Sequence, residues 1–181
     1  MATKATVYKV QLQIADMDRH YYQDHSLTLA QHPSETEERL MVRVLAFILN
    51  ASDTLSFSKG LSDEGEPELW DKNLNGDINL WVEFGQSDEK WLRKASGRAK
   101  QVKLYAYGGR SVPNWWKQIQ SSLARYSNLQ VWEIPEEQVK ALALLAARNL
   151  QLQCNISDKQ IWLSNSSDSL MIEPVLLKDF S

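Results

Sequence analysis

The sequence predicts an α/β fold: a mixed sheet flanked by helices, extended by a mainly antiparallel sheet built from the two chain ends. Three observations lead to this prediction. Apolar and polar residues alternate near the N-terminus, a helical pattern occupies residues 34–50, and a strand–helix–strand pattern occupies residues 102–134. Because strand–helix–strand units connect parallel neighbours, part of the sheet is expected to be parallel.

The chain ends read as strands. Near the N-terminus the apolar side chains fall on every second residue: Tyr8, Val10, Leu12 and Ile14. A second extended run, residues 21–29, predicts a hairpin, and three more runs close the chain: 150–156, 160–163 and 170–177. We therefore expect strands within 5–30 and 150–177 to form the added sheet. Joining the ends in this way predicts one domain over 1–181, with its core at about 34–134.

The helix over residues 34–50 has a clear start signal. Ser34 and Glu37 have the spacing of a capping box. Apolar residues then recur at helical spacing, which predicts a buried face: Leu40, Met41, Val44, Leu45 and Ile48. The helical projection places Glu37 within that apolar stripe and turns Glu35 away. The alternative for Glu37 is simply a capping residue at a solvated helix end.

The middle of the chain alternates strands and helices. Strands are expected at 55–57, at 69–70 and at 78–84, where bulky Trp81 indicates that both sheet faces are covered. Asp88 or Ser87 caps the next helix. An extended run over 102–107, a helix through Trp115 and Leu123, a strand over 129–134 and a helix over 136–148 complete the pattern.

Composition narrows the functional class. The chain has 181 residues, a net charge of -3 and one cysteine, Cys154. This composition excludes a uniformly basic nucleic-acid coat, a disulfide framework and a thiolate zinc cluster. No apolar run approaches the length needed to cross a bilayer, and the N-terminus lacks the pattern of a signal peptide, so no membrane association and a cytoplasmic location are expected.

Two carboxylates lie on strands expected to be neighbours. Glu83 is late in the 78–84 strand, and Glu68 lies one hairpin upstream, directly after Pro67. If the strands pair, these carboxylates approach one another and suit Mg²⁺, which prefers oxygen ligands. Such an ion activates water and stabilises phosphoryl transfer. The alternative is an edge glutamate paired with Arg93 or Lys94.

Basic residues cluster just after this strand. Six fall within 14 residues, and two more follow a Gly-Gly turn: Lys90, Arg93, Lys94, Arg98, Lys100, Lys103, Arg110 and Lys117. In an acidic chain this local excess can face phosphates, and Trp115 and Trp116 can offer stacking surfaces. The alternative is a solvated helix face beside a tryptophan-rich core, as charged amphipathic helices usually have.

Three segments carry a resemblance to a known family. They are HPSETEERLMVRVLAFI at 32–48, GDINLWVEFGQSDEKWLRKASGRA at 76–99 and VKLYAYGGR at 102–110. Together with the paired tryptophans at 115–116, they resemble the YaeQ family over essentially the full length. That family consists of bacterial proteins without a firmly assigned activity. The resemblance implies a variant of the PD-(D/E)XK nuclease fold.

The resemblance also implies site residues. Pro67-Glu68 stands for the Pro-Asp pair of the nuclease motif and Glu83 for its second acidic residue, which makes Glu68 and Glu83 the expected metal ligands. Gly85 occupies the position of the motif lysine, so Lys90 or Lys94 would have to replace it. Glu37 matches the helix glutamate that often joins such sites.

The expected function follows from these matches. It is a Mg²⁺-dependent nuclease, or a nuclease-derived protein that binds nucleic acid, with Lys94 and Arg110 contacting phosphate. The alternative is a catalytically inactive nuclease-like fold that binds a protein partner. Gly85 and the acidic net charge favour the alternative.

Overall fold

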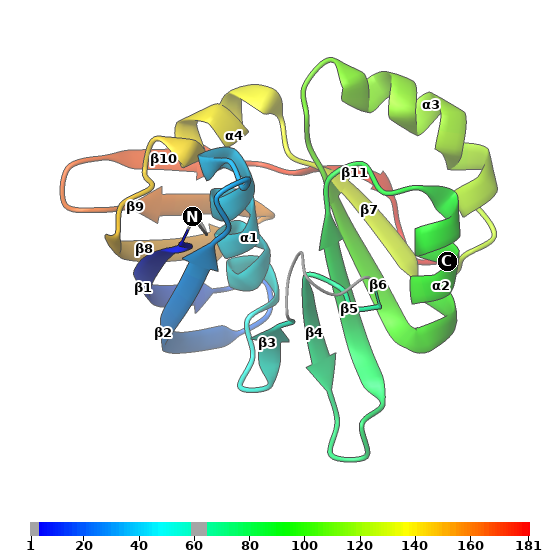
Figure 1. Ribbon diagram of the computed structural model, residues 1–181, viewed down its shortest axis with the longest axis horizontal. Helices are drawn as coiled ribbons and strands as arrows, with labels where there is room; N and C mark the ends of the chain where they lie inside the picture. Colours follow the sequence, from blue (N-terminus) through cyan, green and yellow to red (C-terminus); the bar gives the residue numbers. More distant parts are fainter. Residues whose placement is uncertain (1–3, 59–64) are drawn as a thin grey trace. The chain divides into compact units, whose positions relative to one another are not determined.

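The chain folds into two compact units, which are described separately. The computed structural model describes residues 4–58 and 65–181. One unit comprises Met1–Ile48 and Glu137–Pro174, and the other comprises Leu49–Glu136 and Val175–Ser181 (Figure 1). The fold is of the predicted mixed α/β class. The prediction of a single domain over 1–181 stays a prediction.

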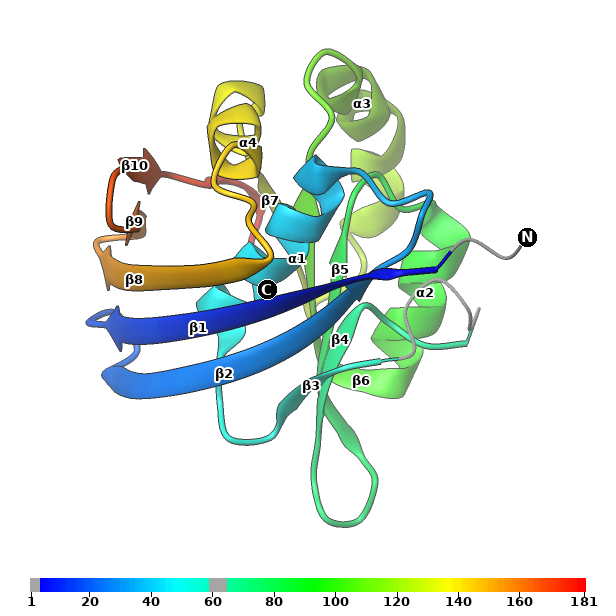
Figure 2. The ribbon, with the colours of Figure 1, turned by 60° about the vertical axis from the view of Figure 1, so that its left-hand side comes forward.

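The first unit is built on a five-stranded sheet from the two chain ends, as the alternating segments predict. Its strands are β1 (Thr6–Asp16), β2 (Tyr21–Gln31), β8 (Asn149–Ser157), β9 (Gln160–Ser164) and β10 (Ser169–Ile172). They lie in the order β10-β9-β8-β1-β2, and Figure 2 shows β8, β1 and β2 side by side. The β1–β8 pair is parallel, whereas the other pairs of this sheet are antiparallel.

Two helices accompany this sheet. The first, α1 (Glu37–Asn50), follows β2, and α4 (Glu136–Ala143) precedes β8. From Leu40 to Ile48 every residue of α1 except Arg43 is buried. A helix that is apolar nearly all round is an interior helix. The predicted single buried face therefore understates how much of α1 is enclosed.

The second unit is built on a six-stranded mixed sheet. Its strands are β3 (Leu55–Phe57), β4 (Leu69–Lys72), β5 (Ile78–Phe84), β6 (Ala99–Ala106), β7 (Leu129–Glu133) and β11 (Val175–Lys178). They lie in the order β11-β7-β6-β5-β4-β3. The central strands β5, β6 and β7 are parallel, which confirms the crossover expected at 102–134.

Helices α2 (Glu89–Arg98) and α3 (Ser111–Leu123) make the two crossovers and pack on one face of that sheet. Trp81, Val102 and Leu129 come from successive parallel strands and form a core with Leu92 of α2 and Leu123 of α3. The predicted cap is confirmed, since the Asp88 side chain accepts a hydrogen bond from the Trp91 N–H at 2.7 Å. This core fixes the end of β5, where the candidate site lies.

Two predicted boundaries are wrong. The predicted strand over 170–177 is two strands: β10 ends at Ile172 and β11 begins at Val175 in the other sheet. Pro174 lies between them and cannot donate a ladder hydrogen bond, while the Glu173 N–H binds the Gln138 side chain. The helix expected over 136–148 ends at Ala143.

Candidate metal and phosphate site

Glu83 lies near the end of β5 and is only 6% exposed. Its side chain is on the sheet face that α2 and α3 cover, because it alternates in phase with Trp81. The Trp81 indole N–H donates a hydrogen bond to Glu83 Oε1 at 2.9 Å. A buried carboxylate needs such a donor, since an unsatisfied charge in the interior is costly.

The register of the neighbouring strand brings Glu68 toward Glu83. Strands β4 and β5 pair antiparallel, as the sequence predicts, with Leu69 opposite Val82 and Trp70 opposite Trp81. Continuing this register by one residue places Glu68 opposite Glu83. The Glu68 carbonyl accepts a hydrogen bond from the Ser58 N–H at 3.2 Å, which extends the pairing of β4 with β3 on its other side. Glu68 lies one residue before β4 begins, and the meeting of the two predicted metal ligands stays a prediction.

Gly85, which follows the last residue of β5, has a positive φ. Its φ is +98°, in the region that side chains rarely adopt. Its N–H still donates to the Tyr105 carbonyl at 2.9 Å, so the strand turns sharply without losing the pairing with β6. A lysine at this position would be strained, and a cation for the site must come from elsewhere.

The cations nearest in sequence form one stripe on α2. Lys90, Lys94 and Arg98 are spaced by four residues and therefore share one side of the helix. All three are exposed. We call them the basic stripe.

The basic stripe is connected to Glu83 through two tryptophans. Lys94 Nζ lies 5.2 Å from the centre of the Trp91 ring, and Arg98 lies 5.3 Å from that of Trp81. The two rings meet edge-on with centres 5.8 Å apart. Trp81 in turn binds Glu83, so Lys94, Arg98 and the buried carboxylate belong to one chain of contacts.

One further cationic candidate and the two aromatic candidates lie at or on α3. Arg110 is exposed, immediately before the helix begins. Trp115 and Trp116 are half-buried and pack against the core, and the Trp115 indole donates to the Ser87 carbonyl. These contacts favour the tryptophan-rich core over exposed stacking surfaces.

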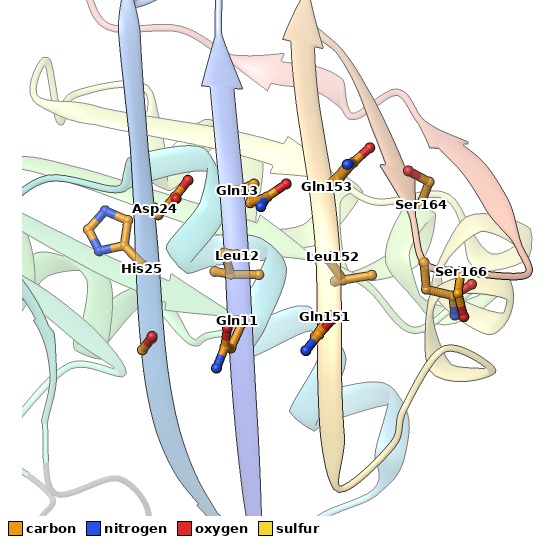
Figure 3. Close-up of a pocket in the computed structure, with 12 residues that line it drawn as sticks. Gln11, Leu12, Gln13, Asp24, His25, Gln151, Leu152, Gln153, Ser164 and Ser166 are labelled. Atoms are coloured by element: carbon orange, nitrogen blue, oxygen red, sulfur yellow. The ribbon is translucent and has the colours of Figure 1, made fainter.

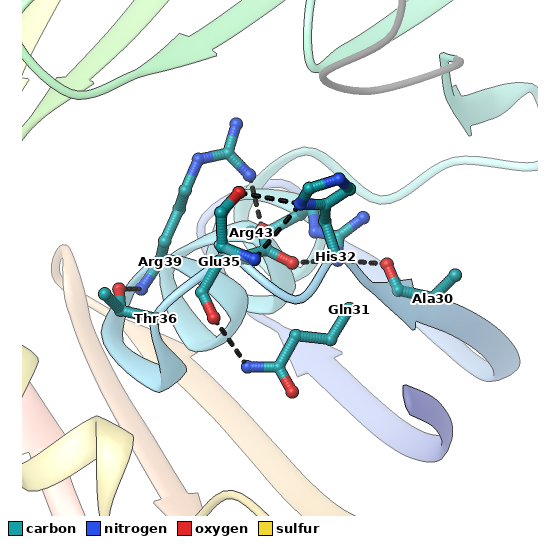
Figure 4. Close-up of polar contacts among 8 residues, drawn as sticks. Ala30, Gln31, His32, Glu35, Thr36, Arg39 and Arg43 are labelled. Carbon is teal, nitrogen blue, oxygen red and sulfur yellow. Dashed lines mark hydrogen bonds and ion pairs between the residues drawn. The ribbon is translucent and has the colours of Figure 1, made fainter. Parts of the chain in front are cut away.

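The burial of the two glutamates near the start of α1 is the reverse of the predicted one. Glu37 is exposed, whereas Glu35 is buried and paired with Arg39 and with Arg43, the latter at 2.8 Å (Figure 4). The cap is Thr36, whose hydroxyl accepts from the Arg39 N–H at 3.1 Å, so the predicted Ser34–Glu37 capping box is wrong. Helical projection failed because residue 35 precedes the helix.

Glu37 and the Glu68–Glu83 pair belong to different units. The role of Glu37 beside the pair stays a prediction. Within residues 4–58 and 65–181, no group of three or more histidine, cysteine, aspartate or glutamate side chains has the arrangement of a metal site. A metal on the Glu68–Glu83 pair would therefore complete its coordination with water or phosphate oxygens, as Mg²⁺ commonly does.

Sequence reasoning missed two residues of this region. Trp81 was read only as a bulky core residue, and Arg98 only as one member of a charged cluster. The two-residue spacing of Trp81 and Glu83 on one strand was the available signal, since it places both side chains on one face. The contact between Arg98 and Trp81 joins a helix to a strand, which no local pattern reveals.

Beside the basic stripe, the carboxylate of Glu89 on α2 is paired with residues that follow α3. Glu89 accepts hydrogen bonds from the Tyr126 hydroxyl at 2.6 Å and the Arg125 guanidinium at 2.9 Å. These contacts hold the pKa of the Glu89 carboxyl below its usual value. Glu89 therefore stays ionised and bound to Arg125 and Tyr126.

Comparisons with known proteins agree on the family. The model of the family described as "YaeQ protein" matches residues 1–174. A relative from Salmonella typhi, described as "Uncharacterized protein YaeQ", is 46% identical over 173 residues, covering 96% of each chain.

Solved structures agree as well. The crystal structure of a YaeQ protein from Xanthomonas axonopodis pv. citri superposes with a TM-score of 0.94 at 44% identity, covering 97% of this chain and 99% of that one. A YaeQ protein from Pseudomonas syringae gives a TM-score of 0.91 at 32% identity, covering 96% of each chain.

In the part of the chain that the structure describes, no helix is long and apolar enough to span a bilayer.

Proposed function

The chain belongs to the YaeQ family, and from its second unit we propose that it binds nucleic acid beside a divalent metal held by Glu68 and Glu83. The observation that carries the proposal is the β4–β5 register, in which Leu69 lies opposite Val82; continued by one residue, it would set Glu68 opposite the buried Glu83. Nuclease-derived binding is proposed ahead of cleavage, because Gly85 stands where the nuclease motif has lysine.

The donor chemistry supports a hard cation. Mg²⁺ takes oxygen ligands and is often held by one or two carboxylates together with waters and substrate phosphates. Glu83 on β5 and Glu68, directly before β4, would be the one or two carboxylates that the protein contributes. A divalent ion there would neutralise phosphate charge and polarise a phosphate ester. Glu83 is oriented for this role by the Trp81 indole.

The basic stripe supports phosphate contact. Lys90, Lys94 and Arg98 extend along one exposed side of α2, a helix whose inner side packs beside Glu83's strand. Contacts from such side chains release counterions and make binding strongly dependent on salt. Arg110, before α3, is a further candidate for phosphate contact.

Metal binding is tested by thermal unfolding with and without millimolar MgCl₂ or MnCl₂. At a metal concentration ten times the dissociation constant, mass action stabilises the native state by about 1.4 kcal/mol. For a chain of this size, each kcal/mol raises the melting temperature by roughly 2–4 °C. Glu83→Gln and Glu68→Gln should each abolish the gain. Glu137→Gln, an exposed glutamate of α4, is the matched control and should retain it.

Nucleic-acid binding is tested by fluorescence polarisation with labelled single strands and duplexes over a salt series. Lys94→Glu should weaken binding and reduce the slope of log K against log salt by about 1. Lys140→Glu on α4 is the matched charge reversal and should leave the slope unchanged. Absence of binding at low salt to every substrate would refute the proposed function.

A second candidate is a catalytically inactive nuclease-like fold that binds a protein. The positive φ of Gly85 favours it, because the motif lysine cannot be restored there without strain. This candidate predicts no metal-dependent stabilisation and no cleavage. It also predicts that a protein partner is retained after Glu83→Gln, which alters only the carboxylate pair.

A further inference from the structure

The outer face of the five-stranded sheet carries an array of side-chain amides. In β8 most of the residues that alternate with the buried ones are glutamine or asparagine, and in β1 two of them are glutamine: Gln11, Gln13, Asn149, Gln151, Gln153 and Asn155. We call these six residues the amide face. The parallel register sets Gln11 beside Gln151 and Gln13 beside Gln153 (Figure 3).

Gln11 with Gln151, and Gln13 with Gln153, form two rows that run across the strands. Neighbouring strands extend these rows with further hydrogen-bonding groups. On β2, Ser26 lies opposite Gln11 and Asp24 lies opposite Gln13. On β9, Ser164 lies opposite Gln153. The rows therefore present amide, hydroxyl and carboxylate groups at the regular spacing of strands, about 4.8 Å apart.

The amide groups are not used by the protein itself. Within the described parts of the chain, the side chains of Gln11, Gln13, Gln151 and Gln153 make no hydrogen bond. Each side-chain amide offers two donor hydrogens and an acceptor oxygen. Asparagine is also disfavoured in strands, so Asn149 and Asn155 oppose local preference.

The face is nearly free of charge. On β1, β2 and β8, its charged residues among those described are Lys9 and Asp24, which balance one another, in a chain with 24% charged residues. An ordinary solvated sheet face in such a chain would carry more lysine and glutamate. A nearly neutral array is poorly matched to a polyanion, whose binding depends on cations.

Aromatic side chains flank one row of the array. Tyr22 on β2 lies opposite Ala15, which is paired with Asn155, and Asn155 lies opposite Trp162 on β9. Tyr22 is 56% exposed and Trp162 is 50% exposed. Three strand spacings separate them, or about 14 Å. Because the Ala15 side chain is small, it does not fill the space above the sheet between the two aromatic rings.

The array borders a hollow. A depression of about 390 Å³ is lined by Gln11, Gln13, Asp24, Gln151 and Gln153, together with residues of the β9–β10 turn. A second depression shares Gln13, Asp24 and Gln153 and continues to Tyr22 and Asn155. The hollow thus runs along the sheet from the amide rows to the aromatic row.

We propose that this face binds a neutral oligosaccharide. Sugar hydroxyls both donate and accept hydrogen bonds, which matches amides and one carboxylate. The apolar faces of pyranose rings stack on exposed aromatic rings such as Trp162 and Tyr22. A neutral polymer needs no cations, which matches the near absence of charge. This site lies wholly in the first unit and does not depend on the proposed metal site.

The test is a titration of the ¹⁵N-labelled full chain with cellohexaose, laminarihexaose, maltohexaose and chitohexaose, followed by NMR. At least one sugar should shift the side-chain amide signals of Gln13 and Gln153. Trp162→Ala and Gln13→Ala should each weaken binding by about tenfold, as central contact residues do. Gln118→Ala, an exposed glutamine of α3, is the matched control and should bind as tightly as the wild type.

Three outcomes would overturn the proposal. The first is no spectral change with any of the four sugars at millimolar concentration. The second is binding that persists in a folded Trp162→Ala, Gln13→Ala double variant. The third is a shift of the same glutamine signals by polyuridylate, or by raising the protein concentration alone, without a response to sugar. These last results would assign the face to nucleic acid or to a second copy of the chain.

Discussion

The five-stranded and six-stranded sheets differ in what their two faces meet. On β1 buried and exposed residues alternate, so one face is apolar and the other is the amide face. On β5 the neighbours Trp81 and Val82 point to opposite faces, and both are fully buried. A mainly antiparallel sheet can leave one face exposed to solvent, whereas a parallel sheet whose strands are joined by helices is normally covered on both faces.

This difference decides where each unit can hold a ligand. The covered sheet leaves only its edges and strand ends, and the candidate metal site lies at such an end, beside Gly85. The open sheet offers a whole face, and its chemistry is that of neutral hydrogen bonding. The two candidate sites therefore call for ligands of different electrostatic character, charged at the end of β5 and neutral on the amide face.

Each unit also buries one glutamate in its own way. Glu35, 7% exposed, is neutralised by two arginines of α1. Glu83 accepts a hydrogen bond from the Trp81 indole N–H. The first arrangement is a structural ion pair, and the second is the one proposed to bind a cation.

The largest expected effect separates these two glutamates. Glu35→Gln should destabilise the protein by about 3–5 kcal/mol, because it breaks a pairing with a buried carboxylate and leaves the charges of two half-buried arginines uncompensated. In metal-free buffer, Glu83→Gln should cost much less, since glutamine retains an oxygen that can accept from Trp81. Urea unfolding of both variants measures the difference. Equal losses would mean that Glu83 too is chiefly a structural residue.

The next effect tests the covered and open faces. Leu69→Ala and Leu104→Ala remove side chains from opposite faces of the six-stranded sheet, and each should cost about 2–5 kcal/mol. On β1, Leu12→Ala should cost a similar amount, but its neighbour Gln13→Ala should stay within about 0.5 kcal/mol. A large loss from Gln13→Ala would show that the amide face is covered.

The smallest effect concerns pH. Burial raises the pKa of the Glu133 carboxyl on β7. Its contribution to stability is therefore fully present below about pH 4.3 and is lost as the pH rises through the raised pKa. Glu133→Gln should remove that loss.

The pKa of Glu89 is shifted in the opposite direction, so Glu89 provides the control. Its lowered pKa contributes stability above about pH 4.3 that is lost as the pH falls. Unfolding curves from acid to neutral pH should thus diverge from the wild type in opposite directions for Glu133→Gln and Glu89→Gln. The same direction for both would contradict the assigned causes.

The sequence by itself determined the strands, the helices and much of the sheet architecture. Alternation over 8–14 and 78–84 and the spacing of apolar residues over 40–48 are local signals, and each became the element it predicts. The hairpin between 69 and 84 followed from its turn residues. It paired β4 with β5, the strand of Glu83, and left Glu68 one residue before β4.

Only the tertiary structure decided the environment of individual side chains. Glu35 became buried because Arg39 and Arg43 turn toward it from the following helix, which projection on a helical wheel cannot show. Residues 170–177 divided between two sheets because each half pairs with a different strand, β9 or β7. Strand partners and ion pairs join residues distant in sequence, and their choice depends on packing energy summed over the whole fold.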